Sequence, residues 1–476
     1  MSNLPFRAWR PALTAITVMM ALSACAIGPD YQRPVLDLPA ATSAPTATLT
    51  QDWWLQFQDP VLNDLIQRAQ QHNQDIARAL ARLDEASAGL TSARADQLPQ
   101  LGVNGQYQRA RLSSVGSNTS LDRGEKVIGS MQTGQATLSY QLDLWGRYRR
   151  ASEAARAELL ASQFAKDTVN LSVAAQVAQG YFNLRALDQQ LQIAEQTLQS
   201  RQASLALREK RYRGGVSSEL EYRQAQAETA ATQAAVPRLQ QAQAAAEKAL
   251  QVLIGASPRE LMTSQVPRGK TVTELTTPPL IPAELPSQLL EQRPDLRAAE
   301  ARLIAANARI GVAKAAYFPN ISLTGNLGSE SLRLADLFSA PAQTWSFVGQ
   351  LAMPIFDFGK TGAAVDAASA RQRQALADYT QAVQNAFRET YVALQAHRTS
   401  REQFAAQTAQ VDALRRALRL AQLRYDNGYS SYLEVLDAQR NLFSAEIDWV
   451  QTRQAQLDAV VSVYLALGGG WSTPRP

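Results

Sequence analysis

Residues that commonly carry enzyme chemistry are scarce in this chain of 476 residues. It contains two histidines, His72 and His397, and a single cysteine, Cys25. A Ser-His or Cys-His nucleophile needs a histidine beside it, and these two histidines stand in unrelated helical stretches. The sequence has no glycine-rich loop for a phosphate or dinucleotide, and acid pairs such as Asp84 and Glu85 are typical of solvated helix faces. It therefore predicts no enzyme activity, no catalytic residue, no cofactor and no metal site.

Composition points to long helices. Aromatic residues make up only 7% of the chain, and alanine, glutamine, leucine and arginine dominate it. The formal net charge is +5, with lysine and arginine interspersed among aspartate and glutamate. No basic face stands out, so we expect no nucleic-acid partner.

Cys25 stands in a context that predicts a lipid anchor. Arg7 and Arg10 precede a short apolar run at residues 12–22, which is typical of a secretory signal. The last four residues, Leu-Ser-Ala-Cys, resemble a bacterial lipobox. That resemblance implies a signal peptide at 1–24, cleavage before Cys25, and N-acyl and S-diacylglycerol groups on Cys25 that bury in membrane lipid. An ordinary signal with a chance cysteine is the alternative.

The chain is built from one long unit used twice. Residues 211–228 (RYRGGVSSELEYRQAQAE) match residues 424–441 (RYDNGYSSYLEVLDAQRN) at an offset of 213. Solenoid repeats recur every few tens of residues, so this is a pseudo-symmetric body instead. The expected segments are a lipidated tether at 25–58, a first repeat at 59–254, a linker at 255–286, a second repeat at 287–467 and a C-terminal tail at 468–476.

Four stretches alternate apolar and polar side chains. They lie at residues 101–107, 134–144, 321–327 and 345–353. A tilted strand needs about ten such residues to cross a bilayer, so we expect one β-hairpin in each half, at about 99–144 and 319–355. The polar positions are mostly Gln, Asn, Ser and Thr, which suits a water-filled lumen. Strands of a soluble sheet are the alternative.

Four strands are too few to close a barrel in a membrane. Open strand edges in lipid leave backbone groups unpaired, and eight strands is the usual minimum. The chain must therefore oligomerise. The strand number alone allows a dimer of eight strands or a trimer of twelve.

Long helices follow the hairpins. The predicted helices run at 59–97, 147–213, 217–254, 287–316, 361–427 and 430–467. The two longest contain no proline, and each spans roughly 100 Å at 1.5 Å per residue. Apolar spacings of three and four within them indicate coiled-coil packing. Pro237 is expected to kink the first returning helix.

Glycine ends each long helix. Gly215 follows the first and Gly428 the second, where a left-handed residue can close the last turn. Ser217 and Ser430 can then N-cap the returning helices.

Seven stretches resemble the outer-membrane efflux protein family, TolC-like in architecture, with the motifs of its lipidated OprM-like (NodT) branch. They are GPDYQRP (28–34), DWWLQFQDPVLNDLI (52–66), RPDLRAAEARL (293–303), AAYFPNISLTG (315–325), IFDFGK (355–360), RYDNGYSSYLEVLDAQRNLF (424–443) and VSVYLALGGGW (461–471). The resemblance covers nearly all of the mature chain.

The resemblance implies a mainly α fold with a β-barrel part. Three chains would form a homotrimer with a twelve-stranded barrel in the outer membrane of a Gram-negative bacterium, continuous with a periplasmic helical tunnel. The family's role is passive export of drugs or other small toxic compounds. A periplasmic membrane-fusion adaptor and an inner-membrane pump, of the RND type, would open the duct.

The resemblance also implies a periplasmic gate. In the lipidated branch, a leucine and an aspartate four residues apart narrow the aperture, and Leu433 and Asp437 match them. Three copies of Asp437 would form an acidic ring, and three of Leu433 an apolar constriction. Alternatively, Leu433 packs in the coiled coil and Asp437 pairs locally. The first half has Leu220 and Gln224 at the equivalent positions.

The turns after the long helices are candidate adaptor contacts, or they merely build the turn. They comprise Gly214, Gly215, Val216, Ser217, Ser218, Gly428, Tyr429, Ser430 and Ser431. Arg211 and Arg424, just before them, are candidates for ion pairs that hold neighbouring helices in a closed state.

Two other functions fit parts of the pattern. A duct for secreted proteins would use the same fold, although protein exporters of this kind are commonly not lipidated. A non-conducting outer-membrane scaffold would need no polar lumen. The sequence does not identify the exported substrate, the particular pump and adaptor, the resting state of the aperture or its regulation.

Overall fold

The computed structural model describes residues 26–38, 52–111, 128–278 and 292–469. Cys25 and the predicted signal sequence lie outside the described residues. So do residues 39–51 of the tether, 112–127 of the first hairpin, 279–291 at the end of the linker and the start of the second repeat, and 470–476 of the tail.

The chain forms two compact units, and each draws on both sequence repeats. The first takes segments from Met1–Val35, Asp84–Ala161 and Ala299–Tyr379, and the second from Leu36–Leu83, Ser162–Ala298 and Thr380–Pro476. Helices α4 (Arg147–Arg213) and α9 (Lys360–Asp426), of 67 residues each, begin in the first unit and end in the second. The two repeats are therefore interleaved.

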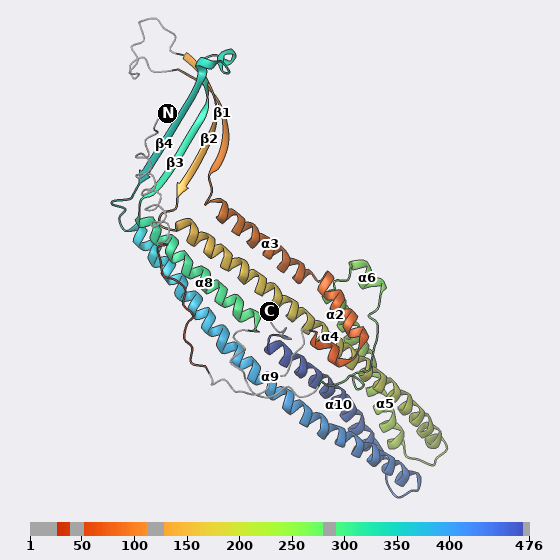
Figure 1. The fold of residues 1–476 in the computed structure, drawn as a ribbon. Coiled ribbons are helices and arrows are strands. Elements are labelled where there is room, and N and C mark those ends of the chain that lie inside the picture. The colour runs from red at the N-terminus through yellow and green to blue at the C-terminus, as the bar shows by residue number, and fades with distance from the viewer. Residues whose placement is uncertain (1–25, 39–51, 112–127, 279–291, 470–476) are drawn as a thin grey trace, which may run out of the picture. The chain divides into compact units, whose positions relative to one another are not determined.

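The first unit contains the sheet that the alternating pattern predicts. Its strands are β1 (Gln100–Arg111), β2 (Ile128–Leu142), β3 (Asn320–Ser331) and β4 (Gln343–Ala352). They lie side by side in the order β1-β2-β3-β4, each antiparallel to the next (Figure 1). The two hairpins thus form one sheet of four strands.

The register places like side chains in rows across the strands. Leu101 pairs with Leu138, Leu138 with Gly325, and Gly325 with Phe347, so the apolar positions share one face. The next row belongs to the other face, where Thr137 Oγ1 donates to Asn326 Oδ1 at 2.7 Å and Asn326 Nδ2 donates to Ser346 Oγ at 3.1 Å. The apolar face has no cover within the described chain, because Val103 is 86% exposed and Trp345 is 79% exposed.

Strands β1 and β4 are the outer strands of this sheet. Each pairs on one side only among the described residues. Such an edge carries a row of unpaired backbone N–H and C=O groups, which water can satisfy and hydrocarbon cannot. In hydrocarbon, this sheet would therefore need partner strands at both edges.

Two neighbouring residues of β1 test which face meets lipid. Arginine at a lipid-facing barrel position costs up to about 2–4 kcal/mol, while arginine in a wet lumen costs little. We expect Val103→Arg to lower the fraction of protein inserted in the outer membrane, measured by extraction and immunoblot. Asn104→Arg should insert as the wild type does. Equal insertion of the two variants would contradict the assignment of faces.

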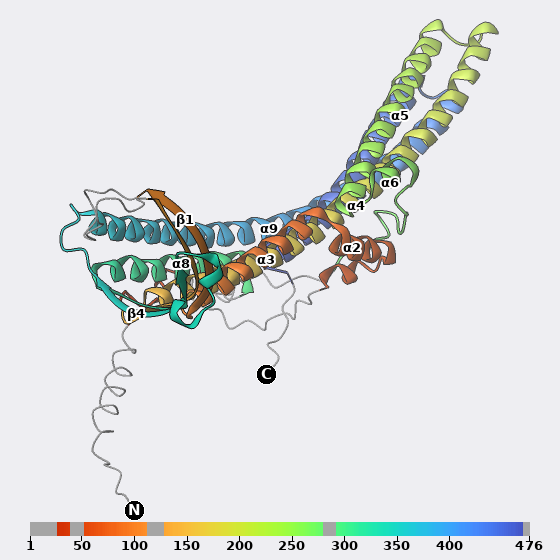
Figure 2. The same cartoon turned by 90° about the horizontal axis from the view of Figure 1, so that it is seen from above.

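The helices follow the predicted order, with shifted caps, one interior break and one additional short helix, α6. They are α2 (Pro60–His72), α3 (Gln74–Ala95), α4, α5 (Glu219–Leu253), α6 (Pro258–Thr263), α8 (Pro294–Lys314), α9 and α10 (Tyr432–Ala466). Short 3-10 turns lie at Trp53–Phe57, Ala315–Tyr317, Leu334–Asp336 and Ala340–Ala342. In the second unit, α5 and α10 lie beside the ends of α4 and α9 (Figure 1 and Figure 2).

The predicted caps of the returning helices are wrong by one residue. Ser218, with extended backbone, precedes α5, and its Oγ accepts a hydrogen bond from Glu221 N at 3.4 Å. Ser431 takes the same position before α10, where its side chain makes no capping bond. Ser217 and Ser430 belong to the turn, and their hydroxyl oxygens are buried without a partner in the described chain.

The single helix predicted at 59–97 is two helices. Asn73 adopts an extended conformation and ends α2. Its Oδ1 accepts from the N–H groups of Asp75 (2.8 Å) and Ile76 (3.2 Å), so it also caps α3. Its Nδ2 donates to Leu253 O at 2.8 Å, which fixes the break against the end of α5.

Two described parts of the predicted tether at 25–58 pack against other segments of the chain. Residues Trp53–Phe57 form a 3-10 helix in the main core of the second unit, where the Trp53 ring stacks on Tyr464 with centroids 5.4 Å apart. Farther toward the N-terminus, Arg33 pairs with Glu300 of α8 in the first unit. These segments lack the apolar periodicity of helices or strands, so the sequence pattern gives no signal for their packing.

Among the described residues, no helix combines the length and apolar character required to span a bilayer.

Candidate functional site

The two tip turns have the same backbone. Gly215 and Gly428 take φ of 73° and 75°, the left-handed region that glycine favours, as the repeat predicts. Val216 N donates to Arg211 O at 2.9 Å, and Tyr429 N donates to Arg424 O at 2.8 Å. These bonds satisfy carbonyls at the ends of α4 and α9. The turns need glycine, but they do not need the side chains that follow it.

Apolar side chains at the tips face outward. Val216 is 69% exposed and Tyr429 is 78% exposed, and both follow the left-handed glycine directly. Buried apolar surface is the main driving force of association, so this pair is suited to a protein contact.

Leu433 and Asp437 lie on the exposed face of α10. Leu433 is 56% exposed, whereas Tyr432, Val435 and Leu436 are buried between the helices. Within the described chain, Leu433 therefore does not pack in the coiled coil. Asp437 is exposed, and its Oδ2 accepts from Asn441 Nδ2 at 3.1 Å. One helical turn apart, the two side chains share a face that the protomer leaves open.

The first repeat offers a similar face without the acid. Leu220 is 66% exposed on α5, and Gln224 is half-buried. Any acidic ring must therefore come from the second repeat.

A buried arginine that the sequence reasoning missed lies just behind the tips. Arg208 of α4 is 3% exposed, and its guanidinium carbon lies 4.5 Å from the Tyr425 ring centroid and 4.3 Å from that of Tyr432. Its Nη1 donates to Tyr425 Oη at 2.5 Å, and Tyr425 Oη donates to Glu221 Oε2 at 3.2 Å. Burial raises the pKa of Tyr425, which keeps it protonated as a donor. This chain of contacts joins α4, α9 and α5.

The two predicted arginines make weaker contacts. Arg424 Nη2 lies 4.0 Å from Glu434 Oε2, and both side chains are about half exposed. The Arg211 guanidinium lies 5.9 Å from the Tyr425 ring centroid. Exposed pairs of this kind contribute little. The strongly held arginine is thus Arg208, one turn before Arg211, and no motif distinguished it.

A second arginine node lies farther from the tips. Arg201 Nη1 of α4 lies 3.1 Å from Glu228 Oε2 of α5, and both side chains are nearly buried. Arg440 Nε of α10 donates to the other carboxylate oxygen, Glu228 Oε1, at 2.6 Å. One carboxylate therefore joins three helices.

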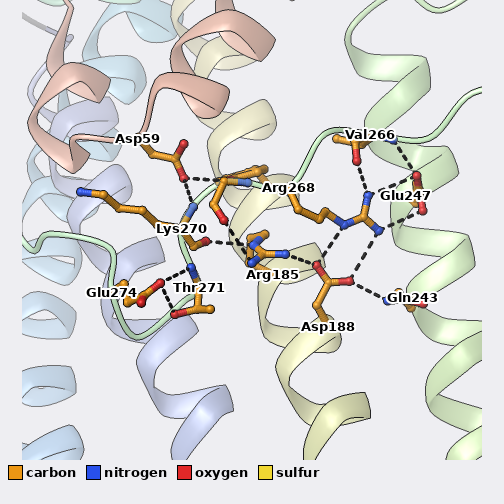
Figure 3. A network of polar contacts seen from close by, with 12 residues as sticks. Asp59, Arg185, Asp188, Gln243, Glu247, Val266, Arg268, Lys270, Thr271 and Glu274 are labelled. Carbon is orange, nitrogen blue, oxygen red and sulfur yellow. Dashed lines mark hydrogen bonds and ion pairs between the residues drawn. The ribbon is translucent and has the colours of Figure 1, made fainter.

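The linker between the repeats is held by a network of polar contacts (Figure 3). Asp59, the N-cap of α2, accepts from Lys270 N at 3.0 Å and from Tyr181 Oη at 2.7 Å. Arg185 of α4 donates to Lys270 O at 2.9 Å and to Gly269 O at 3.3 Å. These bonds satisfy the linker backbone where it crosses α2 and α4.

Arg268 is the centre of this network. Its guanidinium bridges Asp188 of α4, with Nε 3.0 Å from Oδ2, and Glu247 of α5, with Nη2 3.0 Å from Oε2 (Figure 3). Burial would raise the pKa of Glu247, but hydrogen bonds from Arg268 and from Val266 N bring this pKa below its usual value. The carboxylate therefore stabilises the fold in its charged form.

Arg453 of α10 holds the linker from the other side. It donates to Leu275 O at 2.6 Å, to Val272 O at 3.3 Å and to Thr277 Oγ1 at 2.8 Å. Burial lowers its pKa. Arg268 and Arg453 together fasten residues 266–277 to α4, α5 and α10, and we call this set of contacts the linker clasp.

Arg268→Met tests the clasp. The variant leaves the nearly buried carboxylate of Glu247 without its arginine and leaves Asp188 with Arg185 as its one remaining arginine in the described chain, a change that costs on the order of 3 kcal/mol. We expect a lower melting temperature for the detergent-solubilised protein. The pKa of Glu247 is depressed in the folded state. The difference in stability between the wild type and the variant should therefore be largest at neutral pH and should decrease as pH falls through that pKa.

Arg259→Met is the matched control, since Arg259 is exposed on α6. A melting temperature for Arg268→Met equal to that of the control at neutral pH would contradict this role.

Comparison with known proteins gives relatives along the whole chain. Residues 65–256 and 285–469 match the model of the outer membrane efflux protein family. The cation efflux system protein CusC of Escherichia coli (strain K12) is 36% identical over 467 residues, covering 96% of this chain and 99% of CusC. The solvent efflux pump outer membrane protein SrpC of Pseudomonas putida is 36% identical over 474 residues, covering 96% of this chain and 98% of SrpC.

A solved structure has the same fold. The crystal structure of the Campylobacter jejuni CmeC outer membrane channel aligns with a TM-score of 0.89 at 26% identity, covering 95% of this chain and 96% of CmeC. The mainly helical fold with one small sheet is thus that of a TolC-like channel protein, as predicted. The chain belongs to the outer membrane efflux protein family, and the resemblance of its motifs is confirmed. It is an efflux protein of the Gram-negative outer membrane, in a family of transport channels rather than enzymes.

Proposed function

We propose that this protein is the passive exit duct of a tripartite efflux system and works as a homotrimer. Three four-stranded sheets pair at their open edges into a barrel of twelve strands, with the apolar faces in outer-membrane lipid. The polar side chains of the opposite face, including Thr137 and Asn326, then line a water-filled lumen. The sheet with two open edges and one uncovered apolar face is the observation that carries the proposal.

The gate of the proposed duct is the face of α10 that bears Leu433 and Asp437. Both side chains are exposed in the protomer, while their neighbours Tyr432 and Val435 are buried. Around a threefold axis they form an apolar and an acidic ring. Removing the apolar ring widens and wets the constriction, and removing the acid changes its charge selectivity.

Partners at the tips open this gate. Exposed Val216 and Tyr429 contact a periplasmic adaptor, and an inner-membrane pump of the RND type supplies energy. The cargo is drugs or other small toxic compounds. The printed names of two relatives refer to cations and solvents, so the duct itself does not fix the cargo. N-acyl and S-diacylglycerol groups on Cys25 add an anchor in the outer membrane.

Planar-bilayer recording tests the duct. We expect small or no conductance from the wild-type trimer and several-fold larger conductance from the double variant Leu433→Ala, Asp437→Ala. The matched control is Leu220→Ala, Gln224→Ala in the first repeat, which should change conductance less and leave charge selectivity unaltered. A double variant that inserts but never conducts would refute the duct and favour a structural scaffold.

Tip variants test the adaptor contact separately. Val216→Asp with Tyr429→Asp places charges where an apolar contact is proposed, so export in cells should fail while bilayer conductance stays normal. Resistance of an efflux-deficient host measures export. Met262→Asp, which changes an exposed apolar residue of α6, is the control and should export normally. Normal export by the tip variant would contradict the proposed contact.

A further inference from the structure

Residues 26–33 form a strap that is bonded to the first unit along its whole length. At the C-terminal end of the strap, Arg33 donates two hydrogen bonds to the carboxylate of Glu300 in α8, from Nε at 2.7 Å and from Nη2 at 2.6 Å. Tyr31 Oη donates to the same carboxylate at 3.0 Å. Burial raises the pKa of Tyr31, so its hydroxyl stays a donor. Bidentate arginine–carboxylate pairs fix geometry as well as energy.

The middle of the strap is held by Arg150 and by a close backbone approach. Arg150, whose side chain is only 7% exposed, donates from Nη2 to Asp30 Oδ1 at 2.6 Å. Asn307 Nδ2 of α8 donates to Pro29 O at 2.8 Å. Gly28 has φ of 117°, and a Cβ added to Gly311 would lie 2.5 Å from Ile27 O. A side chain at position 311 would collide with the strap backbone, so the strap can pack this closely only because α8 has glycine there.

The N-terminal end of the strap meets the junction between β2 and α4. Ile27 N donates to Trp145 O at 3.1 Å. A Cβ on Gly146 would lie 2.8 Å from Ala26 Cα, so the two backbones touch. Since β2 ends at Leu142 and α4 begins at Arg147, the first described residue of the chain lies at the base of the sheet.

Aromatic side chains mark this level as an interface. The Trp145 ring stacks on Phe318 with centroids 4.8 Å apart, and Trp145 Nε1 donates to Pro319 O, one residue before β3. In the turn from β4 to α9, Phe356 is 78% exposed and Phe358 is 90% exposed. Aromatic residues gather where a membrane protein leaves the hydrocarbon. Ala26 is therefore fixed at the proposed lipid boundary.

We propose that residues 26–33 are a positioning strap that fixes the start of the mature chain at the lipid interface and thereby sets where the acyl chains of Cys25 enter the membrane. The inference rests on the lipid anchor of the proposed function. If the segment of about 30 residues before the first helix were undocked, its two ends would lie roughly 30 Å apart on average, and the position of the lipid anchor would vary over that distance. The docked strap removes this variation in position and keeps the apolar face of the sheet beside the bilayer into which it inserts.

A charge swap across the strap tests the proposal. Arg33→Glu or Glu300→Arg breaks the bidentate pair, and the double swap restores opposite charges in the same place. The full chain is made in a Gram-negative host and labelled with an alkynyl palmitate analogue. We expect equal label in all variants, at least threefold less outer-membrane-inserted protein in each single variant, and recovery of most of this loss in the double swap.

Arg302→Glu makes the same charge change on the exposed face of α8 and should insert as the wild type does. Single variants that insert normally, or a loss that the double swap does not recover, would overturn the strap's role. Wild-type protein without label would refute the lipid anchor and this inference together. Bilayer conductance is measured on the same preparations, so a failure of the duct itself is seen independently.

Discussion

The unpaired backbone at the edges of a four-stranded sheet constrains everything else in this protein. The strands have an apolar face without cover in the described protomer, and hydrocarbon offers no hydrogen bonds to β1 or β4. In the proposed homotrimer, the open edges of each sheet are paired only beside its copies. The remainder of the chain would then have to hold three subunits in one arrangement, and the long helices α4 and α9, which follow the strands in the sequence, are suited to this.

Those helices are fastened by arginines rather than by a thick core. Arg208 joins α4 to the aromatic rings at the tips, Arg201 and Arg440 meet on one carboxylate of α5, and Arg268 ties the linker to α4 and α5. Arginine suits this task because its planar fork serves several acceptors at once and keeps its charge when buried. Each of these arginine contacts has a defined geometry, so it fixes the register of neighbouring helices. The alanine-rich helix interfaces contribute little to that register.

The sequence predicted what local pattern controls. Alternation located the strands, and Gly215 and Gly428 located the turns because only glycine takes that backbone easily. The sequence did not predict contacts between distant segments. Arg33 and Glu300 lie within quoted family motifs, yet only the fold shows that they pair. The break at Asn73 depends on Leu253 O, far away in the chain, and the caps shifted because either serine of each Ser-Ser pair fits the pattern. The exposed face of α10 at Leu433 agrees with the predicted gate, while its role stays a prediction.

The unequal repeats carry a consequence for assembly. The backbones of the two tip turns are alike, but the gate position is Asp437 after one turn and Gln224 after the other, and the side chains directly after Gly215 and Gly428 differ. In the proposed trimer, six near-identical tips would alternate between two chemical types. A partner with six equivalent binding segments would thus meet two types of binding position in strict alternation. It could bind one type tightly and the other weakly.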